Sequence, residues 1–313
     1  MKKQLFISLI LLFILHGLNA QNNFDITLTN TTLSATDSIL PFWFKANQHG
    51  KVPLQQSFVN LTDVHLAQPH VLNPENRFSW SWEANLVAAL GETTSWQLNQ
   101  AFAALAFKGW EIKGGMFHDP IRHAGLSTTN GNLARSGNAR PWPMIRLSTA
   151  GYKPLPFAGK WLSFKGEYDE GILNDNRYVD QARLHHKSLY FKVNPSAGWE
   201  IRMGAEHFVM WGGTSTDERI GAMPESLKAY WHYIRGSAGD ETFPQTDQLN
   251  VAGNQLGTYQ LEIQKKWKES ELTFYLSHPF EDFSGVNWRN WPDNLLGIHL
   301  NLRNKNAIVT GGS

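Results

Sequence analysis

Apolar and polar side chains alternate with a period of two along much of this chain, most clearly over residues 78–90. The even positions, from Phe78 and Trp80 to Leu90, are all apolar, whereas the odd positions begin with Ser79 and Ser81. Such a period turns one face of a strand toward an apolar environment and the other toward a polar one. After a turn at 91–93, residues 94–107 repeat the pattern, and we expect these side chains to share its apolar face: Trp96, Leu98, Phe102, Ala104 and Ala106.

The same alternation predicts further strands within residues 110–116, 162–169, 199–206, 259–264, 272–276 and 296–302. Weaker versions occupy residues 58–66, 145–152 and 184–193. Together they indicate roughly eleven or twelve strands. The two stretches of about thirteen residues exceed the usual five or six residues of a soluble strand and suit a tilted crossing of a bilayer.

The polar face of these strands carries charges of both signs, as at Lys165, Glu167 and Asp169. A soluble β-sandwich also alternates, but its buried face does not accommodate successive charges, because burying an unpaired charge is costly. The interior of a membrane barrel does accommodate them. We therefore predict an all-β fold, a transmembrane antiparallel β-barrel, over the soluble sandwich.

The longest predicted connection, residues 211–255, contains one short helix. Pro224 can occupy its first turn, and Gly236 can end it. The apolar side chains Leu227, Tyr230, Trp231 and Ile234 recur at helical spacing and are expected to share one face. Such a helix most often packs its loop or plugs the lumen, and a partner site is the alternative.

The N-terminus has the three parts of a cleavable signal peptide. Lys2 and Lys3 precede an apolar run over residues 5–15, and residues 16–20 end in Ala20. The run is too short to span a bilayer as a helix, which disfavours an anchor. We assign residues 1–20 to the signal peptide and 21–313 to the barrel domain. No later apolar run approaches helix-spanning length, so strands must make any membrane crossing.

Composition removes several classes of function. The 313 residues include no Cys, which excludes disulfides, Cys-ligated zinc and thiol catalysis. Removing Lys2 and Lys3 from the 28 basic residues leaves 26 against 27 acidic ones, so nothing suggests a nucleic-acid partner. At 18%, charged residues fall below the roughly 25% of soluble domains.

Several stretches resemble the capsule assembly family named after Wzi. They are residues 40–52 (LPFWFKANQHGKV), 131–143 (GNLARSGNARPWP), 161–166 (WLSFKG), 185–190 (HHKSLY), 211–213 (WGG) and 282–297 (DFSGVNWRNWPDNLLG). The resemblance implies a closed, lectin-like outer-membrane barrel of about eighteen strands. About twelve strands fit into residues 21–313, so we expect the domain to be incomplete at its C-terminus.

The resemblance also implies a protein that is not an enzyme, uses no cofactor and binds capsular polysaccharide or exopolysaccharide. Outer-membrane lipid and the barrel-assembly and export machinery are its other expected partners. The sequence agrees, because it contains no GxSxG, HExxH, P-loop or dinucleotide motif. An outer-membrane or secreted hydrolase would need a nucleophile or carboxylate pair that the sequence does not reveal.

The sequence gives little support for a metal site or for glycosidase activity. Alternation sends His185 and His186 to opposite faces, and it separates Asp169 from Glu170 in the same way. His118 and His123 flank a proline-containing turn. We therefore predict no metal site and no paired catalytic carboxylates.

Carbohydrate binding has better candidates. Sugar rings stack on aromatic side chains, and their hydroxyls pair with planar polar groups. Three loop segments combine both chemistries, and from them we predict these polysaccharide-binding residues: Arg135, Asn138, Arg140 and Trp142; Trp231, His232, Tyr233 and Arg235; Trp288, Arg289 and Trp291. The alternative for each Trp is the interfacial girdle of a barrel. The predicted function is non-enzymatic binding or organisation of exported capsular polysaccharide, and the alternative is a porin.

Overall fold

The computed structural model describes residues 24–68, 78–127, 129–134, 137–302 and 310–313. The predicted signal peptide lies outside these residues. The strands are β1 (Asp25–Ser34), β2 (Phe58–Gln68), β3 (Phe78–Gly91), β4 (Ser95–Phe107), β5 (Trp110–Met116), β6 (Met144–Thr149), β7 (Lys153–Pro154), β8 (Leu162–Ile172), β9 (Val179–Asp180), β10 (Arg183–Val193), β11 (Trp199–Trp211), β12 (Thr214–Ser215), β13 (Asn254–Lys266), β14 (Ser270–Phe280), β15 (Leu295–Leu302) and β16 (Gly311–Gly312).

Helices are few and short. They are α2 (Phe42–Lys45), the 3-10 turn η1 (His123–Gly125), α3 (Leu227–Arg235), α4 (Gln245–Leu249) and α5 (Phe283–Val286). None of the helices in the described part of the chain has the length and apolar character needed to cross a membrane.

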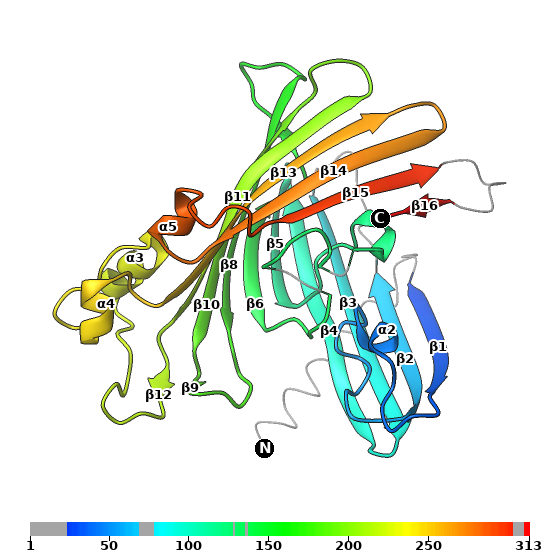
Figure 1. Cartoon of the computed structure of the whole chain (residues 1–313), viewed down its shortest axis with the longest axis horizontal. Coiled ribbons are helices and arrows are strands. Elements are labelled where there is room, and N and C mark those ends of the chain that lie inside the picture. Colours follow the sequence, from blue (N-terminus) through cyan, green and yellow to red (C-terminus); the bar gives the residue numbers. More distant parts are fainter. Residues whose placement is uncertain (1–23, 69–77, 128, 135–136, 303–309) are drawn as a thin grey trace.

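The long strands form one antiparallel sheet in the order β1-β2-β3-β4-β5-β6-β8-β10-β11-β13-β14-β15-β16 (Figure 1). β7 pairs with β8, and β9 and β12 form a small separate ladder. Neighbours in the sheet follow one another along the chain, as in a meander of hairpins. The prediction of an all-β antiparallel fold is confirmed, and every predicted strand region is present. β1 was not predicted, because its alternation is carried mainly by Thr and Asn rather than by aromatic residues.

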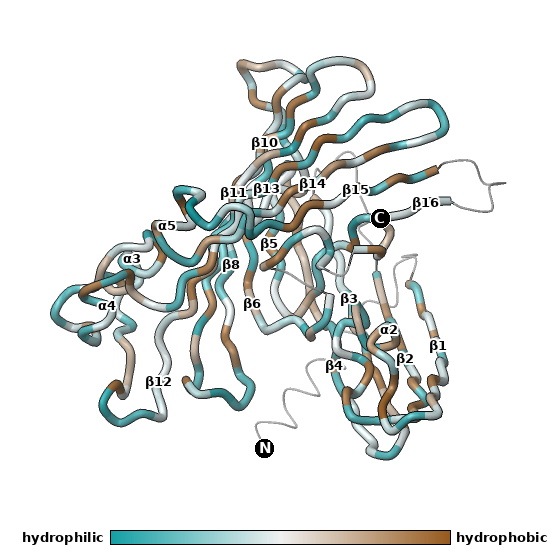
Figure 2. The backbone as a smooth tube through the Cα atoms, in the orientation of Figure 1, coloured by the Kyte–Doolittle hydropathy of each residue, from teal (hydrophilic) through white to brown (hydrophobic). Residues whose placement is uncertain are grey.

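The sheet turns its apolar side chains outward and its polar side chains inward. On β3, Leu86 is 51% exposed whereas its neighbour Asn85 is 5% exposed. On β6 and β8, Arg146 and Asp169 are buried beside the exposed Leu147. Brown and teal segments alternate along the strands in Figure 2. We call the side with Leu86 and Leu147 the outer face and the side with Asn85, Arg146 and Asp169 the inner face. A water-soluble core has the opposite arrangement.

A bulge corrects the predicted face of β4. Asn85 pairs with Gln100 but Leu86 pairs with Leu98, so one extra residue lies in β4 at Asn99. Because side chains alternate with a period of two, one inserted residue moves all later side chains to the other face. The prediction that Phe102 and Ala104 share the outer face with Trp96 was therefore wrong. Leu105 and Phe107 are exposed instead, and the Phe102 ring packs on Phe117 with 5.7 Å between centroids.

The sheet curls around its inner face. His118 contacts Asn99 of β4 at 2.8 Å, and the ring centroid of His123 lies 5.4 Å from that of His299 on β15. β4 and β15 are eight steps apart in the sheet, or about 38 Å in a flat sheet. Five residues reach at most about 18 Å. A flat sheet could not make both contacts, so the segment 117–134 bridges strands that curvature has brought together.

The two ends of the sheet differ in their connections. Segments 35–57, 117–143, 212–253 and 281–294 leave from one end, which we call the loop end. Segments 108–109, 194–198 and 267–269 are short turns at the other, the turn end, which also carries the longer connection 150–161, while the loop end also carries the short turn 92–94. The four long segments cover different faces: the first two lie on the inner face, and the last two on the outer face.

The predicted helix is present but presents a different face. It begins after Ser226, whose side chain accepts a hydrogen bond from the amide of Ala229, and ends at Gly236 in a left-handed conformation. Gly236 was predicted to end it; Pro224 lies before its first turn. Ala229, Tyr233 and Ile234 are buried, whereas Leu227 is 82% exposed. The prediction that Leu227 and Trp231 share the packed face was wrong, because the buried stripe runs through Ala229 and Tyr233.

Candidate functional site

The segment after β1 folds over the inner face at the loop end. Leu40 and Val52 are buried there against Val59, Leu61 and Val87 of β2 and β3. These anchors hold both ends of a loop whose middle contains α2. Trp43 and Phe44 of α2 remain 74% and 41% exposed. The packing therefore fixes the loop while leaving two aromatic rings uncovered beside the inner face.

A cavity of about 540 Å³, which we call the interior cleft, opens between this loop and β1–β4. Its volume falls within the range of small-ligand sites. Trp43 and Phe44 line it on the loop side. The strand side presents Asp63, which accepts hydrogen bonds from Lys51 and from the amide of Asn85. Because these partners hold each other, the wall is ordered before any ligand arrives.

A second cavity of about 400 Å³ adjoins the interior cleft, and both are lined by Trp43, Gln48, His49 and His118. The two imidazole rings lie 4.1 Å apart between centroids. The side chain of Asn99 joins them, since His118 Nε2 lies 2.8 Å from its Oδ1 and its Nδ2 donates to the carbonyl of His49 at 2.8 Å.

Both histidines are held neutral. Burial lowers the pKa of His118 to about 4, with further lowering by His49 and Lys51 and an opposing effect of Asp119. Burial also lowers the pKa of His49, again helped by Lys51. At neutral pH the two rings therefore offer uncharged donors and acceptors rather than cations.

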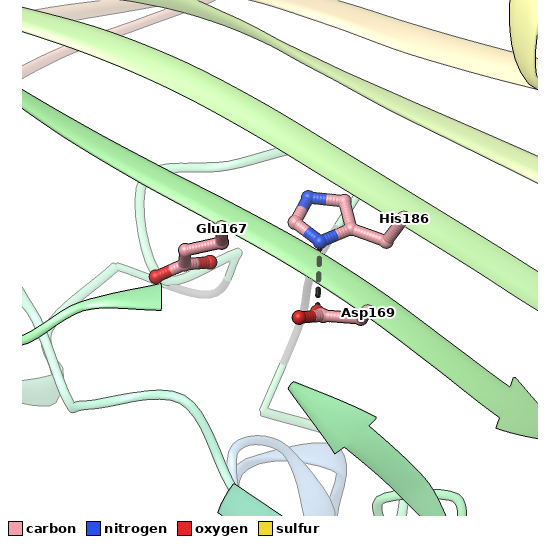
Figure 3. A group of neighbouring side chains, drawn as sticks. All are labelled: Glu167, Asp169 and His186. Carbon is pink, nitrogen blue, oxygen red and sulfur yellow. Dashed lines mark hydrogen bonds and ion pairs between the residues drawn. The ribbon is translucent and has the colours of Figure 1, made fainter. Parts of the chain in front are cut away.

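A network of charged and polar side chains lies on the inner face, and Figure 3 shows three of its members, Glu167, Asp169 and His186. Arg146 donates to both oxygens of Asp169, at 2.8 and 2.7 Å, and Asp169 also bonds Nδ1 of His186 at 2.8 Å. Arg146 reaches Asp119 at 3.3 Å, and Asn132 donates to Glu206 of β11 at 3.0 Å. The network thus ties the segment 117–134 to β6 and β11, which explains why charges persist on this face.

Three of these groups, Glu167, Asp169 and His186, have potential ligand atoms within 4.8 Å of one another. Both oxygens of Asp169 are already engaged by the guanidinium of Arg146. A cation would have to displace that charge-assisted pair, which is bidentate and buried. The geometry therefore describes an ion network rather than a metal centre.

The first predicted cluster lies beside the second cavity. Asn138 accepts a hydrogen bond from the amide of Asn47 at 2.8 Å, and Arg140 is exposed next to Gly50. Trp142 packs its ring directly against the backbone at Gly171, where no Cβ would fit. Arg135, the fourth member, lies outside the described residues. The block therefore braces the loop that carries Trp43, and Arg140 is its exposed cation.

The second and third predicted clusters lie on the outer face. Tyr233 is 1% exposed and packs against Val209, Trp211 and Phe243, so its ring has no free face for a sugar. His232 Nδ1 donates a hydrogen bond to the carbonyl of Ala238 at 2.6 Å. Trp231 is exposed with Arg235 stacked over its ring at 5.5 Å.

Trp288 and Trp291 sit in the segment after β14. The Trp288 ring stacks on His278 of β14 with 3.9 Å between centroids, and on Tyr259 of β13 at 5.6 Å. Trp291 and Arg289 are exposed beside it. Because Tyr259 and His278 belong to the outer face, the structure separates these residues from the Asn138–Trp142 block on the inner face.

Two predictions about side-chain direction are confirmed. His185 contacts Tyr168 and Tyr230 on the outer face, whereas His186 contacts Asp169 on the inner face. Glu170 likewise bonds His185 at 2.6 Å, on the side opposite Asp169. Sequence reasoning missed the residues of the interior cleft, although the FWF triplet at 42–44 lay within a stretch already singled out. Strand pairing brings Asp63, Asn85 and Asn99 together, and no local pattern in the sequence indicates this.

An antiparallel sheet with an apolar outer face, a charged inner face and long loops at one end defines a β-protein of the outer-membrane type. The chain belongs to the family of the capsule assembly protein Wzi, whose model matches residues 68–304. The crystal structure of Pseudomonas aeruginosa OccK2 (OpdF) is similar at 12% identity with a TM-score of 0.28, over 71% of this chain and 58% of that one. The chain thus spans less than two thirds of that protein. No curated protein matches it.

Proposed function

We propose that this protein sits in the outer membrane and holds or organises exported capsular polysaccharide at the cell surface by non-covalent binding. One observation carries the proposal: the interior cleft pairs two exposed aromatic rings with an ordered wall of hydrogen-bonding side chains. That combination matches a sugar, which has apolar C–H faces and polar hydroxyls. Membership of the capsule assembly family supports the choice of polymer.

The arrangement of connections supports an orientation. In outer-membrane barrels the short turns are periplasmic and the longer loops are extracellular. By that rule the loop end faces the outside, where exported polysaccharide accumulates. The interior cleft opens among the loop-end segments, so the proposed binding site and the proposed location of the ligand agree.

Binding rather than turnover is the proposed activity. The acidic residues on the inner face are paired with cations, as Asp63 is with Lys51 and Asp169 is with Arg146. A glycosidase needs one carboxyl group held protonated and a second one placed about 5–9 Å away across the scissile bond. The carboxylates of Asp63 and Asp169 are instead held in ion pairs by Lys51 and Arg146.

Gene deletion tests the proposal. Cells lacking the protein should synthesise capsule at the normal rate but retain less of it, so more polysaccharide appears in the medium. Each sugar contact is weak, but many copies acting on a repeating polymer give strong retention. Loss of synthesis, or unchanged retention, would contradict the anchoring role.

Point variants locate the site. Trp43→Ala should lower cell-bound capsule, and so should the double change Arg140→Ala with Trp142→Ala, which removes the exposed cation and the ring that packs against Gly171. Trp96→Phe on the outer face is the control. The alternative of a diffusion channel predicts measurable conductance of the purified protein in a bilayer and an effect of deletion on solute uptake rather than on capsule retention.

A further inference from the structure

The interior cleft and the adjoining cavity contain almost no unbalanced charge. Among the described residues that line them, Lys51 is the single Lys or Arg, and its ammonium group is bonded to Asp63. Asp119 lines the second cavity and pairs with Arg146 at 3.3 Å. The nearby Lys45 donates to the carbonyl of Leu54 at 3.3 Å. No cation of the lining is left over for an anionic ligand.

The remaining polar groups are neutral amides and imidazoles. Asn85 and Asn99 are buried, with their hydrogen bonds given to Asp63 and to the His49 carbonyl. Nδ1 of His49 is buried without a hydrogen-bond partner among the described residues. A buried polar atom left unpaired is unfavourable, so the hydrogen bonds within the neutral lining do not satisfy all of its polar atoms.

An acidic sugar would fit this lining poorly. Its carboxylate would lose water, gain no unpaired cation, and lie near the carboxylates of Asp63 and Asp119. Removing a charge from water without a counterion is far more costly than removing a hydroxyl that finds new partners. A neutral sugar fits the lining better, since the Trp43 ring can cover its C–H face while neutral polar side chains of the lining, such as Gln48, Thr29 and Thr31, bind its hydroxyls.

We propose that the interior cleft binds an uncharged stretch of the polysaccharide, with Trp43 stacked on a neutral sugar ring, and that any acidic groups of the polymer remain outside it. The inference rests on the proposed function and names the ligand class of the same site. The exposed Arg140, taken alone, would instead predict a preference for acidic sugar units.

The test uses the purified full chain in detergent and oligosaccharides released from the cell's own capsule by partial hydrolysis. Half of the preparation is treated to reduce uronic carboxyls to alcohols, which removes charge and keeps the linkages. Titration calorimetry with both preparations should give equal or tighter binding after reduction. The measured affinity should also change little between about 50 and about 500 mM salt, a range over which the screening of charges increases strongly.

Variants assign the site. Trp43→Ala should weaken binding of the reduced oligosaccharides about tenfold, and Trp43→Phe should restore most of the affinity, because stacking energy is retained. Trp96→Ala is the matched control, since Trp96 is similarly exposed, at 77%, but lies on the outer face. Heat-modifiable migration on gels checks that each variant is folded.

The outcomes separate the two proposals. Binding that is lost on carboxyl reduction would overturn the neutral-sugar inference and leave polysaccharide binding intact. Binding of reduced oligosaccharides that is insensitive to Trp43→Ala would also overturn it, by placing the site elsewhere. Absence of binding by either preparation would overturn the proposed function itself.

Discussion

Leu189 tests whether the outer face meets lipid. It lies near the middle of β10, between Gly166 of β8 and Ala205 of β11, and is 48% exposed. Replacing it with Arg places a charge on the outer face near the centre of the strand. In a lipid bilayer this costs about 2–4 kcal/mol at the midplane. On a protein surface in water, a change of this kind stays within about 0.5 kcal/mol.

The difference is measurable. A loss of 2–4 kcal/mol shifts the folding equilibrium roughly 30- to 700-fold. We would unfold the protein with urea in lipid vesicles and compare Leu189→Arg with Leu189→Met, which keeps the site apolar. Thr27→Arg is the second control, because Thr27 is exposed on β1 on the side of Thr29 and Thr31, which line the interior cleft.

The expected order of stability is Leu189→Met close to the original protein, Thr27→Arg slightly below it, and Leu189→Arg well below both. Equal stability of Leu189→Arg and Leu189→Met in vesicles would refute the assignment of the outer face to lipid. Equal damage from Leu189→Arg and Thr27→Arg would show that the inner face is not an aqueous interior.

Three further predictions concern the site and its supports. Because the pKa of His118 is lowered to about 4 from an ordinary value of 6.5, its neutral form stabilises the fold above pH 6.5, and this contribution is lost as the pH falls toward 4; glycan affinity of the folded protein should fall only near pH 4, where His118 becomes protonated, and His118→Gln should remove that fall. Arg146→Met leaves Asp169 buried without its bidentate partner and should cost about 3–5 kcal/mol in urea unfolding, largely recovered when Asp169→Leu is added. Tyr233→Ala should cost about 3–5 kcal/mol of stability without weakening glycan binding by the folded fraction, whereas Tyr233→Phe should cost much less.

The strand pattern was available from the sequence because its cause is local. Each strand separates an apolar from a polar environment, so the alternation over residues 78–90 and 110–116 predicted β3 and β5 to within a residue. The charged inner face followed from Lys165, Glu167 and Asp169 for the same reason. The end of α3 at Gly236 was also predictable, because a left-handed residue there favours glycine.

Only the tertiary structure decided where the loops go. The three predicted clusters look alike in sequence, yet one lies on the inner face and two lie on the outer face, because packing of whole segments against distant strands is not encoded in local spacing. The bulge at Asn99 reversed a face for a similar reason, since register depends on the partner strand. The interior cleft joins Trp43 to Asp63, Asn85 and Asn99 through strand pairing and sheet curvature, and no stretch of sequence contains that juxtaposition.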